Sequence, residues 1–263
     1  MFCGKVADSE EHIIGKWLLR DLGLYNFKSR IGFGRQRADG SMDEIDAPQP
    51  LGGFRTKEVC RDCNNGWMSG LETYVKPRLA GLFDDPVSLN HRLMFQGLFV
   101  PAPFIARWLL KTACTFGAKM SIPVPSSLRQ RLYAGLLHPE LSVDLSINEQ
   151  CGAYIGISRE WNVYDGQSLA VKSVAGESFR FVWQVRHLAM RVSYFPGCEM
   201  NMTKPRFPVR VYPRFCVAPD WKDGSTTRQS YRYESLEQLE HETFYFIDGN
   251  PENPWLRDFR QTF

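Results

Sequence analysis

The sequence predicts an α+β protein in which a small N-terminal module precedes a larger domain of helices and antiparallel strands. A close Cys-x-x-Cys pair that leads directly into a helical pattern marks the first part, residues 1–85. In the second part, residues 86–263, an amphipathic helix over residues 104–118 is followed by a series of short β-rich segments. Helical and β-rich runs that are segregated along the chain are typical of the α+β class.

The Cys-x-x-Cys pair is formed by Cys60 and Cys63 in the stretch VCRDCNNGWMSGLE. Two thiolates at this spacing can bind one zinc ion, because the turn between them aims both sulfurs at a common point. Residues 67–79 are predicted to be helical, since their apolar side chains recur on one face. Asn64 therefore lies where a zinc-binding turn meets a helix N-terminus, a place suited to an anion or to a metal–phosphate pair.

The N-terminal segment MFCGKVADSEEHIIGKWLL supplies further candidates. Cys3 is a candidate third ligand for the same zinc, brought across by a short hairpin. Glu11 and His12 precede an apolar run. We expect a short helix from His12 to Leu22, with Gly23 as its C-cap. A single histidine at the start of an apolar helix is more typical of a hydrogen-bonded core residue, but the nearby cysteines favour a catalytic role.

The elements after this segment follow from turn residues and periodicity. Residues 25–58 are predicted to form a β-hairpin with a long polar loop, because Asp39-Gly40 is a turn signal. The motif helix should continue to residue 83, where Asp84-Asp85-Pro86 ends it. Ser126-Ser127 is expected to cap a helix that runs to Leu137.

The remaining segments are predicted to be β-strands followed by a short helix. The strand candidates are residues 151–158, 168–174, 179–185, 187–195 and 208–215, which are rich in β-branched and aromatic side chains between turn residues. Residues 234–242 are acidic and are predicted to form a short helix. A domain boundary is expected near residues 85–103.

Composition limits the functional classes. The formal charge of +3 is too small to identify a nucleic-acid-binding protein by itself, and no apolar run is long enough to span a membrane. No secretory signal opens the sequence, and most of its seven cysteines are scattered, which suits free thiols in a reducing compartment. We therefore expect a cytoplasmic protein without a membrane partner.

Local charge is more informative than the total. Between Phe179 and Phe215 there are seven basic residues and one acidic residue, whereas the segment after Cys216 is acidic. Such a basic face could follow a phosphate backbone, but strand positions that point arginines into water would give the same pattern. The basic residues are Arg180, Arg186, Arg191, Lys204, Arg206, Arg210 and Arg214.

Together, the cysteines, the Glu-His pair and the asparagine resemble the HNH (ββα-metal) endonucleases, in the subgroup whose motif is braced by a zinc knuckle. That motif contains a Cys-x-x-Cys pair, an acidic residue next to histidine, and a second Cys-x-x-Cys pair followed directly by His or Asn. The segments EEHIIGKWLL and CNNGWMSGLE are similar to a bacterial group with EHIIPKWL and CNNGWMS signatures. The resemblance covers residues 1–75 and implies an N-terminal ββα-metal module with a treble-clef-like zinc site.

The resemblance implies a nuclease that hydrolyses phosphodiester bonds of DNA with the help of a divalent metal. His12 would be the general base that takes a proton from the attacking water. Glu11 and Asn64 would hold Mg²⁺ or Mn²⁺ at the scissile phosphate, because hard cations prefer oxygen ligands. The zinc held by the cysteines would be structural and would not touch the substrate.

In HNH-like proteins, a loop in the position of residues 25–58 approaches the substrate. The resemblance therefore implies that arginines of this segment contact nucleic-acid phosphates, although exposed arginines on loops commonly have no such role. The candidates are Arg30, Arg35, Arg37 and Arg55.

Departures from the family pattern leave a second function open. The chain shows three of the four expected zinc ligands, so an upstream cysteine, a water or another side chain would complete the site. Gly15 stands where the group has proline, and the middle Asn has no match, with Arg55 or Thr56 in its neighbourhood. The alternative is a catalytically inactive zinc module that binds nucleic acid or a protein partner through its second domain. In that case Asn64 would only cap the helix, and Glu72, a further ligand candidate, would be a solvated or salt-bridged carboxylate.

Overall fold

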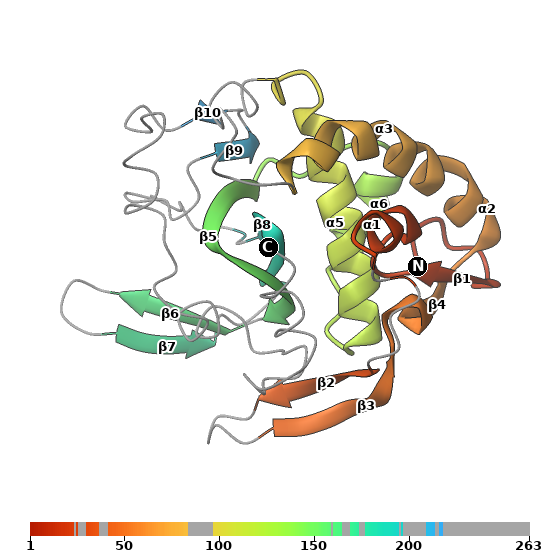
Figure 1. Ribbon diagram of the computed structural model, residues 1–263, viewed down its shortest axis with the longest axis horizontal. Helices are drawn as coiled ribbons and strands as arrows, with labels where there is room; N and C mark the ends of the chain where they lie inside the picture. Colours follow the sequence, from red (N-terminus) through yellow and green to blue (C-terminus); the bar gives the residue numbers. More distant parts are fainter. Residues whose placement is uncertain are drawn as a thin grey trace.

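The computed structural model has an α+β architecture built around the helix α5 (Ala102–Lys119), which lies between an antiparallel sheet and the N-terminal elements (Figure 1). The predicted fold class is therefore confirmed at this level. The structure describes residues 1–23, 25, 30–36, 42–83, 97–158, 160–164, 169–173, 177–194, 196, 209–213 and 216–217.

The elements of the described part fall into helices and strands. Besides α5, the helices are α1 (Lys16–Asp21), α2 (Arg61–Cys63), α3 (Ser69–Leu79) and α6 (Ser126–Tyr133), with short helical turns at η1 (Leu51–Gly53), η2 (Asn64–Met68) and η3 (Ala80–Leu82). The strands are β1 (Ser9–His12), β2 (Arg30–Gln36), β3 (Met42–Pro50), β4 (Arg55–Val59), β5 (Leu141–Ser158), β6 (Glu160–Tyr164), β7 (Leu169–Ser173), β8 (Phe179–Tyr194), β9 (Val209–Tyr212) and β10 (Cys216–Val217).

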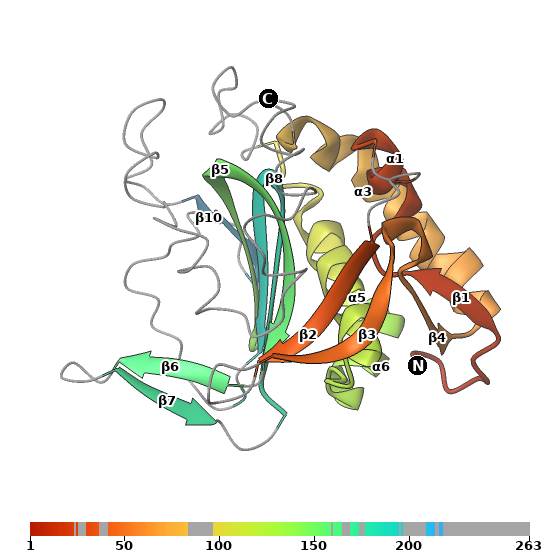
Figure 2. The same cartoon turned by 60° about the horizontal axis from the view of Figure 1, so that its bottom comes forward.

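The largest sheet is antiparallel, with the strand order β10-β9-β5-β8. Its two long strands, β5 and β8, run side by side next to α5 (Figure 2). Two separate hairpins, β2–β3 and β6–β7, are each two-stranded and antiparallel. The β2–β3 pair confirms the hairpin predicted within residues 25–58, and its turn at Asp39-Gly40 lies outside the described residues.

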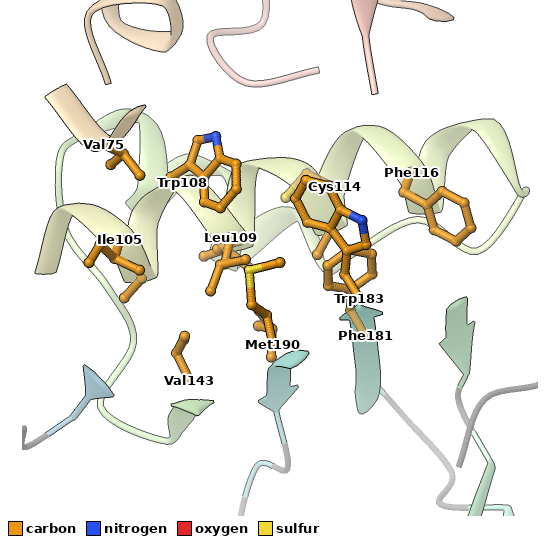
Figure 3. Packing of buried hydrophobic residues seen from close by; sticks show 14 of the residues in the cluster. Val75, Ile105, Trp108, Leu109, Cys114, Phe116, Val143, Phe181, Trp183 and Met190 are labelled. Carbon is orange, nitrogen blue, oxygen red and sulfur yellow. The ribbon is translucent and has the colours of Figure 1, made fainter. Parts of the chain in front are cut away.

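The core is formed where α5 packs on this sheet. Trp108 lies 5.3 Å from Trp183 of β8, and Phe116 lies 5.9 Å from Phe181, measured between ring centroids (Figure 3). On its other side α5 contacts N-terminal elements, where Trp17 of α1 lies 6.0 Å from Trp108. A helix covered on both sides must be apolar nearly all round, and every residue from Trp108 to Gly117 is buried.

The N-terminal module consists of two paired strands and a helix. Strand β1 pairs with β4 in antiparallel register, with Glu11 opposite Thr56 and His12 opposite Arg55. The chain then enters α2, η2 and α3 without a long connection. The β2–β3 hairpin is an insertion between the two paired strands. This arrangement positions β1 and the start of the motif helix side by side.

Two helix predictions are wrong in their bounds. His12 ends strand β1 rather than starting a helix, because its backbone pairs with β4, and helix α1 begins only at Lys16. Gly23 does follow the helix end with a φ of +70°, the left-handed conformation expected of a glycine there. Helix α6 ends at Tyr133, before a left-handed Gly135 with a φ of +80°, and Pro125 rather than Ser126 is its N-cap.

The β-rich half was predicted in outline. The two segments at residues 179–185 and 187–195 form one strand, β8, in which Arg186 takes a φ of +52°. Strand β5 begins ten residues before the predicted segment, at Leu141. The acidic helix predicted at residues 234–242 lies outside the described residues. Within the described residues, no helix is both long enough and apolar enough to cross a membrane.

Candidate functional site

Three cysteine thiols meet at the junction of the N-terminal segment and α2. Cys60 is the N-cap of α2 and Cys63 is its last residue, so one helical turn brings both sulfurs to the same side. The Sγ atoms of Cys3 and Cys60 are 3.3 Å apart, and all three sulfurs lie within 4.8 Å of one another. Tetrahedral zinc with Zn–S bonds of about 2.3 Å separates its sulfurs by about 3.8 Å, so the three thiols fit such an ion.

The N-terminal segment is fixed to α2 by polar contacts around these thiols. The Asp8 carboxylate accepts a hydrogen bond of 2.7 Å from the backbone N–H of Arg61. The Lys5 ammonium lies 2.6 Å from the Asp62 carboxylate, although both side chains are exposed. Phe2 packs edge-on against Trp67 with ring centroids 5.2 Å apart. These contacts hold Cys3 over the α2 turn, so the thiols are positioned by the fold.

The pKa values of the Cys3 and Cys63 thiols shift in opposite directions, because burial dominates at Cys63 and hydrogen bonds dominate at Cys3. Burial raises the pKa of the Cys63 thiol to about 12. Hydrogen bonds from the backbone at Lys5 and from Cys60 lower the pKa of Cys3. Zinc binds thiolates, so its binding would release protons and would reverse the effect of burial on Cys63. Among the described residues, these three cysteines form the group of His, Cys, Asp or Glu side chains that could hold a metal ion.

His12 lies beside Arg55 on the paired strand. The Arg55 Nε–H donates a hydrogen bond of 3.1 Å to His12 Nε2, and its Nη1 donates one of 2.9 Å to the Glu10 carboxylate. Burial is the main cause that lowers the pKa of His12 to about 4, followed by the positive charges of Arg55 and Lys16. The imidazole is therefore neutral near pH 7, and its Nε2 is the acceptor.

Asn64 connects the motif helix to strand β1. Its Nδ2 donates hydrogen bonds of 3.1 Å to the Ser9 hydroxyl and of 3.1 Å to the Glu10 backbone carbonyl. Asn64 does not act as the N-cap of α2, which is Cys60. Its described side-chain contacts therefore align the helix with the strand that carries His12.

Glu11 precedes His12 in strand β1 and has a different partner. Its carboxylate binds the Nζ atom of Lys111 from α5 at 2.8 Å, and Glu72 of α3 binds the same nitrogen at 2.6 Å. The Lys111 side chain is only 1% exposed. Burial alone would lower the pKa of the Lys111 ammonium, but the carboxylates of Glu72 and Glu11 outweigh it and hold the pKa above its usual value.

The described side-chain contacts of Glu11, His12 and Asn64 are made with other residues, and their convergence on one point stays a prediction. Glu11 is engaged by Lys111, His12 by Arg55, and the Asn64 amide nitrogen by Ser9 and Glu10. A Mg²⁺ ion needs several oxygen ligands about 2.1 Å from one centre. The hydrogen bonds described for Asn64 involve its amide nitrogen rather than the oxygen that would bind a metal, and Lys111 holds Glu11 Oε1. The divalent-metal site on Glu11 and Asn64 therefore stays a prediction.

The remaining predicted contact residues belong to the β2–β3 hairpin or lie outside the described residues. Arg30 and Arg35 lie on β2, opposite Pro50 and Asp43 of β3, whereas Arg37 is outside the described residues. Only Arg55, among the arginines predicted to contact nucleic acid, is shown beside His12.

Two members of the basic stretch are tied to a buried carboxylate rather than pointing freely into water. Arg191 Nη2 and Arg210 Nε bind the two oxygens of Asp144 at 3.1 and 3.0 Å. Asp144 is 1% exposed, so these arginines compensate a buried charge in the sheet. Lys204, Arg206 and Arg214 lie outside the described residues. The basic stretch therefore gives only weak support for a phosphate-binding face.

Sequence reasoning did not single out Lys111, although a signal was present. The helix segment FIARWLLKTACTFGA places one lysine among residues that are otherwise suited to burial. A lysine within a helix that is apolar all round needs a buried carboxylate partner. Two glutamates of the N-terminal module supply that partner.

No family model, no curated protein and no solved structure matches this chain.

We expect protonation of His12 to destabilise the folded protein. Its pKa is lowered from 6.5 to about 4, so the unfolded chain binds the proton more tightly than the folded chain does. The stabilisation is therefore complete above about pH 6.5 and is lost as the pH falls toward 4. Between these values the free energy of unfolding of His12→Gln should decrease less than that of the wild type, as measured by urea denaturation. His138→Gln is the matched control, and equal slopes for wild type and His12→Gln would contradict the expectation.

Proposed function

We propose that this protein is an HNH-like endonuclease that hydrolyses phosphodiester bonds of DNA, with His12 as the general base. The observation that carries the proposal is the pair formed by His12 and Arg55, in which a neutral imidazole lies 3.1 Å from a guanidinium. A neutral imidazole can accept a proton from an attacking water once the Arg55 Nε–H has left the lone pair of Nε2. A guanidinium is suited to bind the phosphate that the water attacks.

The charges around His12 also suit a phosphodiester. The Arg55 side chain is 37% exposed, so its guanidinium can be reached by a substrate. Lys57 is 83% exposed on the same strand, and the charge of Lys16 is close enough to influence His12. Because the Arg55 charge helps to lower the pKa of His12, a bound phosphate would offset that charge and raise the pKa toward the usual value. Substrate binding would thus make His12 a better base.

The positions of Arg55 and Asn64 relative to the strand that carries His12 also support the proposal. Arg55 takes the place opposite His12 in the β1–β4 pair, and Asn64 fixes the helix to the carbonyl of Glu10. The three-cysteine site lies at the start of the same helix and could hold a metal such as zinc. No step of the reaction is assigned to a divalent metal on Glu11 and Asn64, since Lys111 Nζ already binds the Glu11 carboxylate.

The test of this function is cleavage of plasmid DNA by the purified, zinc-loaded protein. We expect the wild type to nick or linearise the plasmid, and His12→Ala to reduce the rate about 10²- to 10⁴-fold, the range typical of losing a general base. Arg55→Ala should weaken both DNA binding and cleavage, because it removes the phosphate contact. Reactions should be run with Mg²⁺, with Mn²⁺ and without added divalent ion.

The controls separate chemistry from folding. His12→Ala should retain its zinc and its DNA affinity, since the base acts only in the chemical step. His138→Ala removes a histidine from elsewhere in the chain and should cleave like the wild type. Cleavage by His12→Ala at the wild-type rate, or no cleavage by the wild type under all metal conditions, would overturn the proposed nuclease activity.

A second candidate is an inactive zinc module that binds nucleic acid or a protein partner. The observation that favours it is the ion pair between the Lys111 ammonium and the carboxylate of Glu11, the residue predicted to bind the catalytic metal. In that case the wild type would bind DNA with an affinity that decreases with salt but would not cut it. If the protein neither binds nor cuts DNA, a protein partner becomes the better assignment.

A further inference from the structure

Three elements that are distant in sequence meet at one buried nitrogen atom. Lys111 Nζ of α5 lies 2.8 Å from Glu11 Oε1 of β1 and 2.6 Å from Glu72 Oε1 of α3. The lysine side chain is 1% exposed, and those of Glu11 and Glu72 are 11% and 20% exposed. The two carboxylates come from the N-terminal module, whereas the cation comes from outside it.

Two carboxylates turned toward one point require a positive charge or a shared proton between them. Without either, their mutual repulsion and the loss of hydration would both oppose folding. A divalent metal ion can supply this charge, and carboxylate oxygens are the ligands that such an ion prefers. Here the charge is an ammonium group held by hydrogen bonds, and one nitrogen bridges both glutamates.

Gly15 leaves room for this arrangement at the end of strand β1. A Cβ atom at position 15 would lie 3.2 Å from Glu72 Oε2 and 2.8 Å from Trp17 Nε1, closer than side chains normally approach. A proline, which carries a Cβ, would therefore displace Trp17 and crowd Glu72. The glycine allows Glu72 to approach the strand that carries Glu11.

We infer that the Lys111 ammonium is the resident cation of this site and takes the place of a divalent metal between Glu11 and Glu72. The inference rests on the proposed function only where it places the Lys111–Glu11–Glu72 cluster in a nuclease site. The binding of a cation between the two glutamates can be tested without measuring any activity. It has two consequences. The wild type binds no divalent ion at Glu11, and removal of the lysine charge leaves a carboxylate pair that binds one.

The experiment is titration of the zinc-loaded protein with Mn²⁺, followed by electron paramagnetic resonance of the free ion. The wild type and Glu11→Gln are expected to bind the same amount of Mn²⁺, because no ion binds at Glu11 in the wild type. Lys111→Met removes the charge but retains an unbranched side chain, and it should gain one Mn²⁺ site per chain. In Lys111→Met combined with Glu11→Gln that site should be lost, because one ligand is missing. Circular dichroism reports whether each variant is folded.

Each outcome decides the inference. Mn²⁺ binding by the wild type that depends on Glu11 would overturn it, because a metal would then displace the lysine. Folded Lys111→Met without a Mn²⁺ site would also overturn it and would leave the cluster a purely structural ion pair. If Lys111→Met does not fold, the comparison of wild type with Glu11→Gln still tests the first consequence. Absence of DNA cleavage would reject the proposed function without changing any of these binding results.

Discussion

Replacing Cys60 and Cys63 together by serine is expected to remove bound zinc and to unfold the N-terminal module. The three thiols of the site lie within 4.8 Å of one another and come from the N-terminal segment and α2. Structural zinc in small modules contributes on the order of 10 kcal/mol of apparent binding free energy at neutral pH. This is comparable to the total stability of a domain, about 5–15 kcal/mol, so the amides of the paired strands β1 and β4 should lose their protection from hydrogen exchange once the metal is absent.

Elemental analysis and hydrogen exchange measure this effect. We expect one zinc per wild-type chain and none in the double variant, with faster amide exchange in β1, β4 and α2. Cys114→Ser is the matched control, because Cys114 is a buried thiol on α5 away from the three-cysteine site. The Cys114→Ser variant should keep its zinc even if its free energy of unfolding is lower than that of the wild type. Freshly purified wild type without zinc, or an unchanged zinc content in the double variant, would refute the metal site.

The parts of the fold that were predicted correctly are those set by local patterns. The Cys60–Cys63 spacing predicts two sulfurs on one side of a turn, and the structure places them so. The apolar periodicity of residues 104–118 predicts the helix observed at Ala102–Lys119. In both cases the pattern lies within a few turns of chain, so it needs no information on distant contacts.

The features that could not be predicted depend on distant contacts. His12 is in a strand because its backbone pairs with Arg55, 43 residues away, and this pairing overrides the helical pattern of the residues that follow. Glu11 binds Lys111, which is 100 residues away. The adjacency of Glu11 and His12 in sequence suggests one site, but the two side chains have different partners in the structure.

Replacing Trp108 by alanine should destabilise the N-terminal module and the sheet together. Trp108 is 1% exposed, and its ring lies 6.0 Å from Trp17 of α1 and 5.3 Å from Trp183 of β8. Buried apolar residues of both predicted parts form one continuous cluster around it. Large-to-small changes at such a position cost about 3–5 kcal/mol, because the cavity that remains is only partly filled by its neighbours.

Denaturant unfolding followed by two probes tests whether the cluster makes one cooperative unit. Release of zinc to a chromogenic chelator reports on the N-terminal module, and far-ultraviolet circular dichroism reports on the whole chain. In Trp108→Ala both transitions should move to lower denaturant concentration by the same amount.

Trp108→Phe keeps an aromatic ring and removes an indole N–H that has no hydrogen-bond partner among the described residues. It should therefore lower the free energy of unfolding much less than Trp108→Ala does. Tyr133→Ala, at a side chain that is 48% exposed, should change little. A shift of the dichroism transition with unchanged zinc release would show that the two parts unfold independently.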